Sequence, residues 1–258
     1  MSSAILGFLT EAQTSMILAF AVFLRVGAAM AVLPGFGERA IPLRVRLMVS
    51  IAFTLIVWPL ASDYLPSQLP EINPIMFITE AVVGLAMGII FRLFIMALQL
   101  AGMMAAQATS LSQIFGGGAT PDPMPAFGNI LVVGGLALAM MSGLHVKLAL
   151  ALAQSYSVMP LGSFPTPSDL TSWGVDGISA TFELAFTLAA PFIVASVIYN
   201  VAIGAINRAM PQLQVAFVGA PAITFSGLLL LAITAPMILR IWLSEFDKVL
   251  SNPFGGGF

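Results

Sequence analysis

The sequence contains no cysteine and a single histidine, His145. Without cysteine the chain can form no disulfide, use no thiol nucleophile and offer no thiolate to a metal. One histidine is too few for a His-rich metal site. Thiol chemistry and Cys- or His-based metal sites are therefore excluded, and we predict no cofactor.

Charged residues are also scarce, at 8% of the chain, whereas 59% of the residues are hydrophobic and the mean hydropathy is +1.03. A soluble domain has about 25% charged residues, so this chain has too few to cover a surface that faces water. The nine Lys and Arg residues form no cluster of the kind that binds nucleic acid. This composition predicts an integral membrane protein.

Long apolar runs, separated by short polar or Pro/Gly-rich breaks, make up most of the chain. The runs cover residues 12–33, 47–58, 75–98, 127–144 with a weaker extension to 158, 178–206 and 215–243. Four or five of them reach the roughly 20 residues that a spanning helix needs. We therefore predict an all-α membrane protein, forming a single membrane domain over residues 1–258. The short run that ends at Pro59 and the stretch before Val158 predict hairpins or partial insertions.

The ends of the runs carry local signals. Residues 1–10 contain no Lys or Arg, so the first run lacks the basic flank of a signal peptide and is predicted to be a retained transmembrane helix. Residues 161–176 form a polar stretch that predicts a loop, with Asp176 as the N-cap of the next helix. Pro191 and Pro236 lie inside apolar runs and predict kinks or breaks there.

Loop charge predicts the topology. Residues 35–46 include Arg39, Arg44 and Arg46, so this loop is expected on the cytoplasmic side. Residues 61–74 and 160–177 hold acidic residues but no Lys or Arg, and are expected on the opposite side with the N-terminus. Arg208 agrees with this topology, whereas Arg240 near the C-terminus does not.

Five ionisable residues lie within the apolar runs: Arg25, Glu80, Arg92, Glu183 and Arg240. A charge at the centre of a span costs about 2.5–3.5 kcal/mol on insertion scales, so Arg25 is not expected to face lipid. Glu80 and Arg92 are roughly 18 Å apart along one helix and need partners elsewhere. We favour snorkelling or structural ion pairs at subunit contacts; a proton relay is the alternative, and the absence of clustered carboxylates counts against it.

Residues 99–113 are polar or small, although they follow an apolar run. Gln99, Met103, Gln107 and Ser110 share one helical face, and the intervening Ala and Gly residues allow close helix approach. This pattern indicates either a pore lining or tight helix packing. Gly84 and Gly88 form a GxxxG pair, which favours a packing face.

A glycine-rich stretch, residues 115–118, follows this segment. It lacks the Lys-Ser/Thr of a phosphate-binding loop, so nucleotide binding is rejected. The stretch is either a plain connector or a flexible obstruction in a channel, with Ile114 and Phe115 as apolar contacts. Ser155 and Ser157 lack the second histidine or acid of a nucleophile triad, and we predict no enzyme activity.

Four local patterns, in order along residues 14–245, together resemble the FliR family of flagellar export proteins. The most specific is Asn207-Arg208-Ala209-Met210-Pro211-Gln212-Leu213-Gln214-Val215, followed by Gly219-Ala220-Pro221. The others are Leu33-Pro34-Gly35-Phe36-Gly37 with Ile41-Pro42-Leu43-Arg44-Val45-Arg46-Leu47; Ala101-Gly102 with Gln107 and Asp122-Pro123; and Gly143-Leu144-His145 with Ser155-Tyr156 and Met159-Pro160-Leu161-Gly162.

The resemblance implies a helical export gate in the bacterial inner membrane, at the flagellar basal body. In it a FliR-type subunit joins FliP and FliQ, contacts FlhB, works with FlhA and passes unfolded flagellar proteins. It implies that residues between Gln107 and Asp122 line or plug the channel: Gln107, Ser110, Ile114, Phe115, Gly116, Gly117, Gly118 and Asp122. It also favours subunit contacts at Arg25, Arg44, Arg46, Glu80, Arg92, Glu183, Asn207, Arg208, Pro211 and Gln212.

Three other functions are compatible with the residues. A virulence-type III secretion homologue shares the fold and the gate role. A small-molecule secondary transporter predicts an internal repeat and a polar site at the membrane midplane, and no repeat is evident. An intramembrane enzyme is the least favoured, because no catalytic pair is visible.

Overall fold

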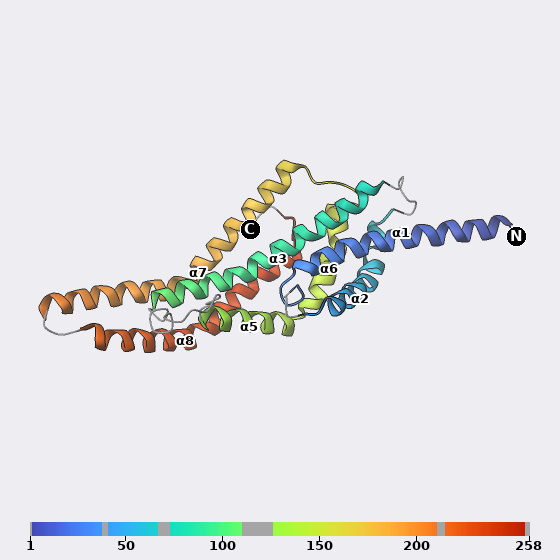
Figure 1. The fold of residues 1–258 in the computed structure, drawn as a ribbon. Coiled ribbons are helices and arrows are strands. Elements are labelled where there is room, and N and C mark those ends of the chain that lie inside the picture. Colours follow the sequence, from blue (N-terminus) through green and yellow to red (C-terminus); the bar gives the residue numbers. More distant parts are fainter. Residues whose placement is uncertain (1, 38–40, 67–72, 110–125, 211–214, 256–258) are drawn as a thin grey trace. The chain divides into compact units, whose positions relative to one another are not determined.

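The computed structural model describes residues 2–37, 41–66, 73–109, 126–210 and 215–255, and in these ranges regular structure is helical throughout (Figure 1). The prediction of an all-α membrane protein is confirmed. In chain order the helices are α1 (Ser2–Val32), α2 (Leu43–Ala61), the 3-10 turn η1 (Ser62–Tyr64), α3 (Pro74–Ala108), α5 (Ala126–Met141), α6 (Leu144–Val158), α7 (Pro167–Ala209) and α8 (Val215–Ser251).

Among the described residues, five segments are long and apolar enough to cross a membrane: Gly7–Val32, Leu43–Tyr64, Pro74–Ala108, Pro167–Ile206 and Ala222–Ser251. The pair α5 and α6 is bent by 75° at the break before Leu144, and adds a sixth if the two helices form one broken span. A hairpin or partial insertion before Val158 stays a prediction. The second run belongs to a longer helix and is not too short to cross a membrane, so its length no longer supports a hairpin or partial insertion there.

The residues at its two ends explain why α2 is longer than the predicted apolar run 47–58. The helix begins after Pro42, whose φ of −56° and ψ of 141° are not helical, and it runs through Pro59 to Ala61. Pro59 lies in the last turn, and the Ser62 hydroxyl donates to its carbonyl at 2.8 Å. Proline has no N–H to donate to the carbonyl four residues earlier, and α2 continues for only two residues beyond Pro59. Pro191 and Pro236 do not end their helices, because α7 and α8 continue through them.

The helix α7 begins well before the predicted boundary. Pro167 occupies its first position, which proline favours because the missing N–H would be unpaired there in any case. The Thr166 hydroxyl accepts a hydrogen bond from the Asp169 N–H at 3.2 Å and so caps the helix. The prediction of a loop over residues 161–176 is therefore right for residues 161–166 and wrong for residues 167–176, and Asp176 lies inside α7 rather than at its N-cap.

The described chain forms two compact units, which divide within α3, α7 and α8 and at the turn between α5 and α6. The first comprises Met1–Leu93, Gly143–Gly177 and Asp247–Phe258. There α2 packs against α1 and α6. The rings of Phe36 and Phe53 meet edge to face, with 6.1 Å between the ring centres. The helices α1 and α3 pack closely, because a Cβ at Gly84 would collide with the Arg25 carbonyl and one at Gly88 would lie 2.7 Å from the Ala29 carbonyl oxygen. The GxxxG packing face is thus confirmed.

The second unit comprises Phe94–Ser142 and Ile178–Phe246. In it α3 and α5 cross at Gly102 and Gly128, where a Cβ on Gly102 would collide with the Gly128 backbone. The fully buried Trp242 of α8 donates its indole N–H to the Phe94 carbonyl at 2.7 Å. Close backbone contact at the glycines and buried aromatic side chains, among them Phe127, Phe192 and Trp242, therefore contribute to this core. The prediction of one membrane domain over residues 1–258 stays a prediction.

Candidate functional site: a buried ion pair between α1 and α3

An ion pair lies inside the first unit, between Arg25 of α1 and Glu80 of α3. Arg25 Nε lies 2.8 Å from Glu80 Oε2 and Arg25 Nη2 lies 3.1 Å from Glu80 Oε1, so the contact is bidentate. Both side chains are 0% exposed. Two residues that the sequence marks separately as charges within apolar runs thus neutralise each other.

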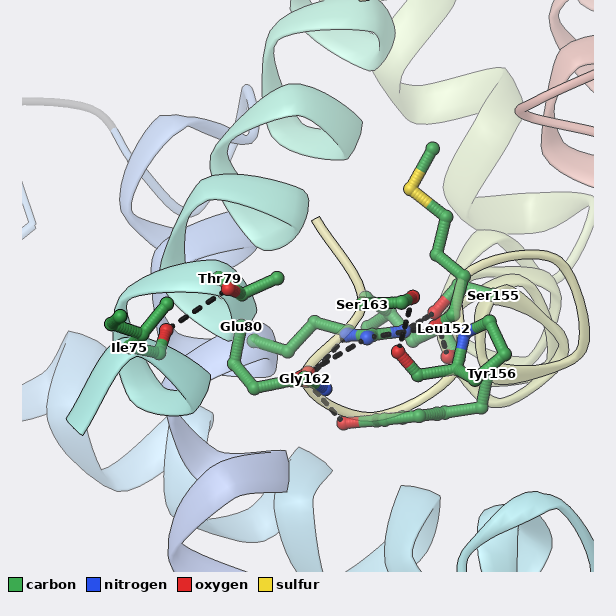
Figure 2. Close-up of polar contacts among 11 residues, drawn as sticks. Ile75, Thr79, Glu80, Leu152, Ser155, Tyr156, Gly162 and Ser163 are labelled. Atoms are coloured by element: carbon green, nitrogen blue, oxygen red, sulfur yellow. Dashed lines mark hydrogen bonds and ion pairs between the residues drawn. The ribbon is translucent and has the colours of Figure 1, made fainter. Parts of the chain in front are cut away.

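The remaining donors of Arg25 are directed to α6 and the segment after it, the parts of the chain that carry Ser155, Tyr156 and Gly162 in Figure 2. Nη1 donates to the Ser155 hydroxyl at 2.8 Å, and Nη2 also donates to the Met159 carbonyl at 3.0 Å. The guanidinium carbon lies 3.7 Å from the centre of the Tyr156 ring, a cation–π contact. Four of the five guanidinium N–H groups therefore have acceptors.

Glu80 is satisfied in the same way. Besides the two bonds from Arg25, it accepts the Tyr156 hydroxyl at 3.3 Å and the Gly162 N–H at 3.1 Å. Gly162 has a φ of +74°, which favours glycine, and a Cβ there would lie 3.2 Å from the Met76 side chain. The backbone after α6 is therefore held directly on the carboxylate of α3.

These contacts join α1, α3, α6 and the segment after α6 at one point. Because the charges are paired and hydrogen-bonded, burying them avoids most of the cost of an isolated buried ion. Neither side chain reaches the surface of this chain, which supports a structural ion pair rather than a proton relay. Whether Arg25 and Glu80 also lie at a subunit contact stays a prediction.

Sequence reasoning missed Tyr156 and Gly162 as partners of the ion pair, and it considered Ser155 only as a nucleophile. A signal was present, because Ser155-Tyr156 and Met159-Pro160-Leu161-Gly162 belong to one of the patterns that carry the resemblance. It could not be interpreted as a binding partner of α1 and α3, since the three segments are far apart in sequence.

The other predicted contact residues lie apart from this cluster. Arg92 is exposed, and its Nη1 lies 3.4 Å from the carbonyl of Val32, the last residue of α1. Arg44, Glu183 and Arg208 are exposed, and Arg46 is half-buried. Pro211 and Gln212, and the side chain of Asn207, lie outside the described residues.

The predicted pore segment is described only in part. On α3, Ala101, Ala105 and Ala106 are buried while Met103 and Gln107 are exposed. The small residues thus pack inside the chain, whereas Met103 and Gln107 face outward. The pore lining stays a prediction. Ser110, Ile114, Phe115, Gly116, Gly117, Gly118 and Asp122 lie outside the described residues.

Two further contacts in the first unit involve residues near the C-terminus. Lys147 Nζ lies 2.7 Å from Asp247 Oδ1, and both side chains are about one-third exposed, at 35% and 38%. Trp173, near the start of α7, donates its indole N–H to the Pro253 carbonyl at 2.8 Å and contacts the Phe254 ring. The C-terminal residues therefore pack against the start of α7.

Comparison with known proteins gives a consistent result. The family described as "Bacterial export proteins, family 1" matches residues 16–249. A flagellar biosynthetic protein FliR from Caulobacter vibrioides is 34% identical over 235 residues, which cover 89% of this chain and 92% of the relative. The proteins of the same name from Aquifex aeolicus and Escherichia coli are each 26% identical, covering 87% and 88% of this chain and 88% of each relative.

Proposed function

Because this chain belongs to family 1 of the bacterial export proteins, we propose that it is a core subunit of the flagellar type III protein-export gate, helping to form and close its channel. Its place as a membrane-embedded component of flagellar protein export follows from the family and from the apolar helices. The near full-length match to flagellar relatives is the observation that carries the proposal. It also favours flagellar export over a virulence-type system.

The channel role is supported by the exposed side chains of Met103 and Gln107 on α3. Gln107 lies at the end of a helix whose neighbouring Ala105 and Ala106 are buried, so its amide is directed away from the core of the second unit. We propose that the segment between Gln107 and Asp122 closes the channel, with the glycines 116–118 giving it freedom to move aside. Unfolded substrate then passes along the exposed amides and methionines.

The proposed partners are FliP and FliQ within the gate, and FlhB and FlhA beside it, in the inner membrane at the basal body. Large exposed apolar side chains on α2 and α7, such as Leu55 at 71% and Val201 at 69%, support burial against lipid or other subunits. Arg44, Arg46, Glu183 and the segment 207–212 are proposed to contact these subunits. No enzyme activity is proposed, so the energy for transport must come from other components and the proton gradient.

Native mass spectrometry of the tagged protein, purified in mild detergent from its own cells, tests the assembly. The expected result is one copy of this chain in a large complex with several copies of two other small membrane proteins. Recovery alone or as a persistent homodimer would contradict the gate and favour a transporter. Loss of swimming in cells that lack the chain, with virulence-type secretion unchanged, would assign it to the flagellar system.

A second experiment addresses the plug. Deleting residues 115–118 should raise the entry of a small membrane-impermeant dye into cells several-fold. The matched control replaces Gly116, Gly117 and Gly118 by serine, which keeps the length of the segment and should leak little. An equal, low leak in both strains would contradict the plug, whereas the mass-spectrometry result would be unaffected.

A further inference from the structure

One face of α3 is left uncovered within the first unit. From Pro74 to Leu93 half of the residues are buried, and one row of large side chains is exposed or half-exposed. This outer row consists of Ile75, Ile78, Val82, Leu85, Ile89 and Arg92. Ile78, Leu85 and Ile89 are 60%, 39% and 47% exposed. Along this row the helix is not covered by its own chain.

The outer row has the spacing of a helix-packing seam. Its members follow one another at intervals of three, four, three, four and three residues, which is a seven-residue apolar repeat. Ile, Val and Leu at such positions fit between the side chains of a second helix that crosses at about 20°. The shape and composition of the row therefore suit one further helix.

Arg92 ends the row and differs from Arg25. Arg25 has its donors taken up inside the chain, whereas the one contact of Arg92 among the described residues is the Val32 carbonyl at 3.4 Å. Of the described carboxylates, none forms an ion pair with Arg92. A guanidinium has five donors and no acceptor, and a carboxylate matches two of them at once. The end of the row is therefore chemically complementary to Asp or Glu.

Arg92 also cannot be placed clear of the membrane while α3 spans it. A span needs about 20 residues, and α3 runs from Pro74 to Ala108. The earliest such stretch is 74–93 and the latest is 89–108, so Arg92 lies within every one. If the span ends near residue 93, the guanidinium can snorkel to the lipid head groups, whereas in every deeper placement of α3 it needs a polar side chain on a neighbouring helix.

We propose that the outer row of α3 is the docking face for a membrane helix of another export subunit, and that this helix brings an Asp or Glu side chain to Arg92. The partner helix lies along Ile78, Leu85 and Ile89 and places its carboxylate at the end of α1. The proposal rests on the proposed function for the presence of such a subunit. It adds which face of this chain binds the subunit and which charge the subunit carries.

Site-specific photocrosslinking in cells that contain the whole export apparatus tests the proposal. A benzophenone side chain replaces Leu85 or Ile89 in turn. The comparison position is Leu55, an exposed apolar residue of α2, whose adducts should not depend on the charge at residue 92. Illumination should give one protein adduct of defined mass from each row position. Combining the Leu85 probe with Arg92→Glu should reduce this adduct at least about tenfold, because like charges then face each other across a buried contact.

Two other variants separate charge from folding. Arg92→Lys keeps the positive charge and should retain most of the adduct. Arg92→Gln keeps a donor for the Val32 carbonyl but lacks the charge, and should lose most of it. The proposal is overturned if the row positions crosslink only to lipid, or if all three Arg92 variants give the same yield. Should the chain co-purify with no export subunit at all, the proposed function fails; co-purification with lipid-only adducts on the row refutes this inference alone.

Discussion

Replacing Glu80 by alanine leaves the Arg25 guanidinium buried without its carboxylate. Removing one partner of a buried ion pair costs about 3–5 kcal/mol. The same change removes acceptors from the Tyr156 hydroxyl and the Gly162 N–H, at about 1–3 kcal/mol for each group that stays buried. We therefore expect Glu80→Ala to destabilise the chain by at least about 3 kcal/mol, and Arg25→Met to have a similar effect.

The double variant Arg25→Met with Glu80→Leu decides whether the ion pair is the cause. When apolar side chains replace both members of a buried ion pair, the effect on stability ranges from neutral to a gain of about 1–4 kcal/mol. Here part of that gain is lost, because the Met159 carbonyl and the Gly162 N–H lose their partners, while Ser155 keeps its bond to the Leu152 carbonyl. The double variant should therefore be more stable than either single variant, with a coupling energy above about 2 kcal/mol.

Thermal unfolding of the purified protein in one detergent, followed by circular dichroism, measures these differences. At roughly 2–4 °C per kcal/mol for a chain of this size, each single variant should lower the midpoint by about 6 °C or more. The control is the Lys147–Asp247 pair, whose side chains are about one-third exposed. Ion pairs that water reaches contribute about 0–1 kcal/mol. Lys147→Met should therefore shift the midpoint by no more than about 2–4 °C. Strictly additive effects of Arg25→Met and Glu80→Leu would refute the reasoning.

Two smaller predictions use the same thermal assay, and a third uses digestion by carboxypeptidase. Gly84→Ala should destabilise the chain, because the new Cβ collides with the Arg25 backbone carbonyl. The control is Gly174→Ala, whose Cβ meets nothing within 4 Å, and this variant should be neutral or stabilising by up to about 1 kcal/mol. Equal shifts of the two midpoints would contradict the close packing of α1 and α3. Thr166→Ala should cost about 1 kcal/mol through loss of the α7 cap, and Thr166→Ser should restore it. Trp173→Phe removes the bond to the Pro253 carbonyl and should expose the C-terminus to carboxypeptidase, which protection equal to the wild type would disprove.

Local properties of the sequence were enough to predict the fold class and several of the helices. Hydropathy and run length depend on neighbouring residues only, and they identified the spans around residues 12–33 and 75–98. The start of α7 was predicted wrongly, because hydropathy takes account of neighbouring residues only. Residues 167–177 are polar enough to suggest a loop, and the Thr166-Pro167 start signal was outweighed by that composition.

The sequence by itself determined that this chain lies in a membrane, that it is helical and that Arg25, Glu80 and Arg92 need partners, because a charge in an apolar run is costly whatever the fold. Only the tertiary structure decided which partners they have. Arg25 meets Glu80 across 55 positions and Ser155 across 130, a pairing that no local pattern encodes. It arises because Gly84 and Gly88 let α1 and α3 approach closely enough for two charges to neutralise each other inside the chain. Arg92, about one turn beyond Gly88 and beside the end of α1, keeps an exposed side chain.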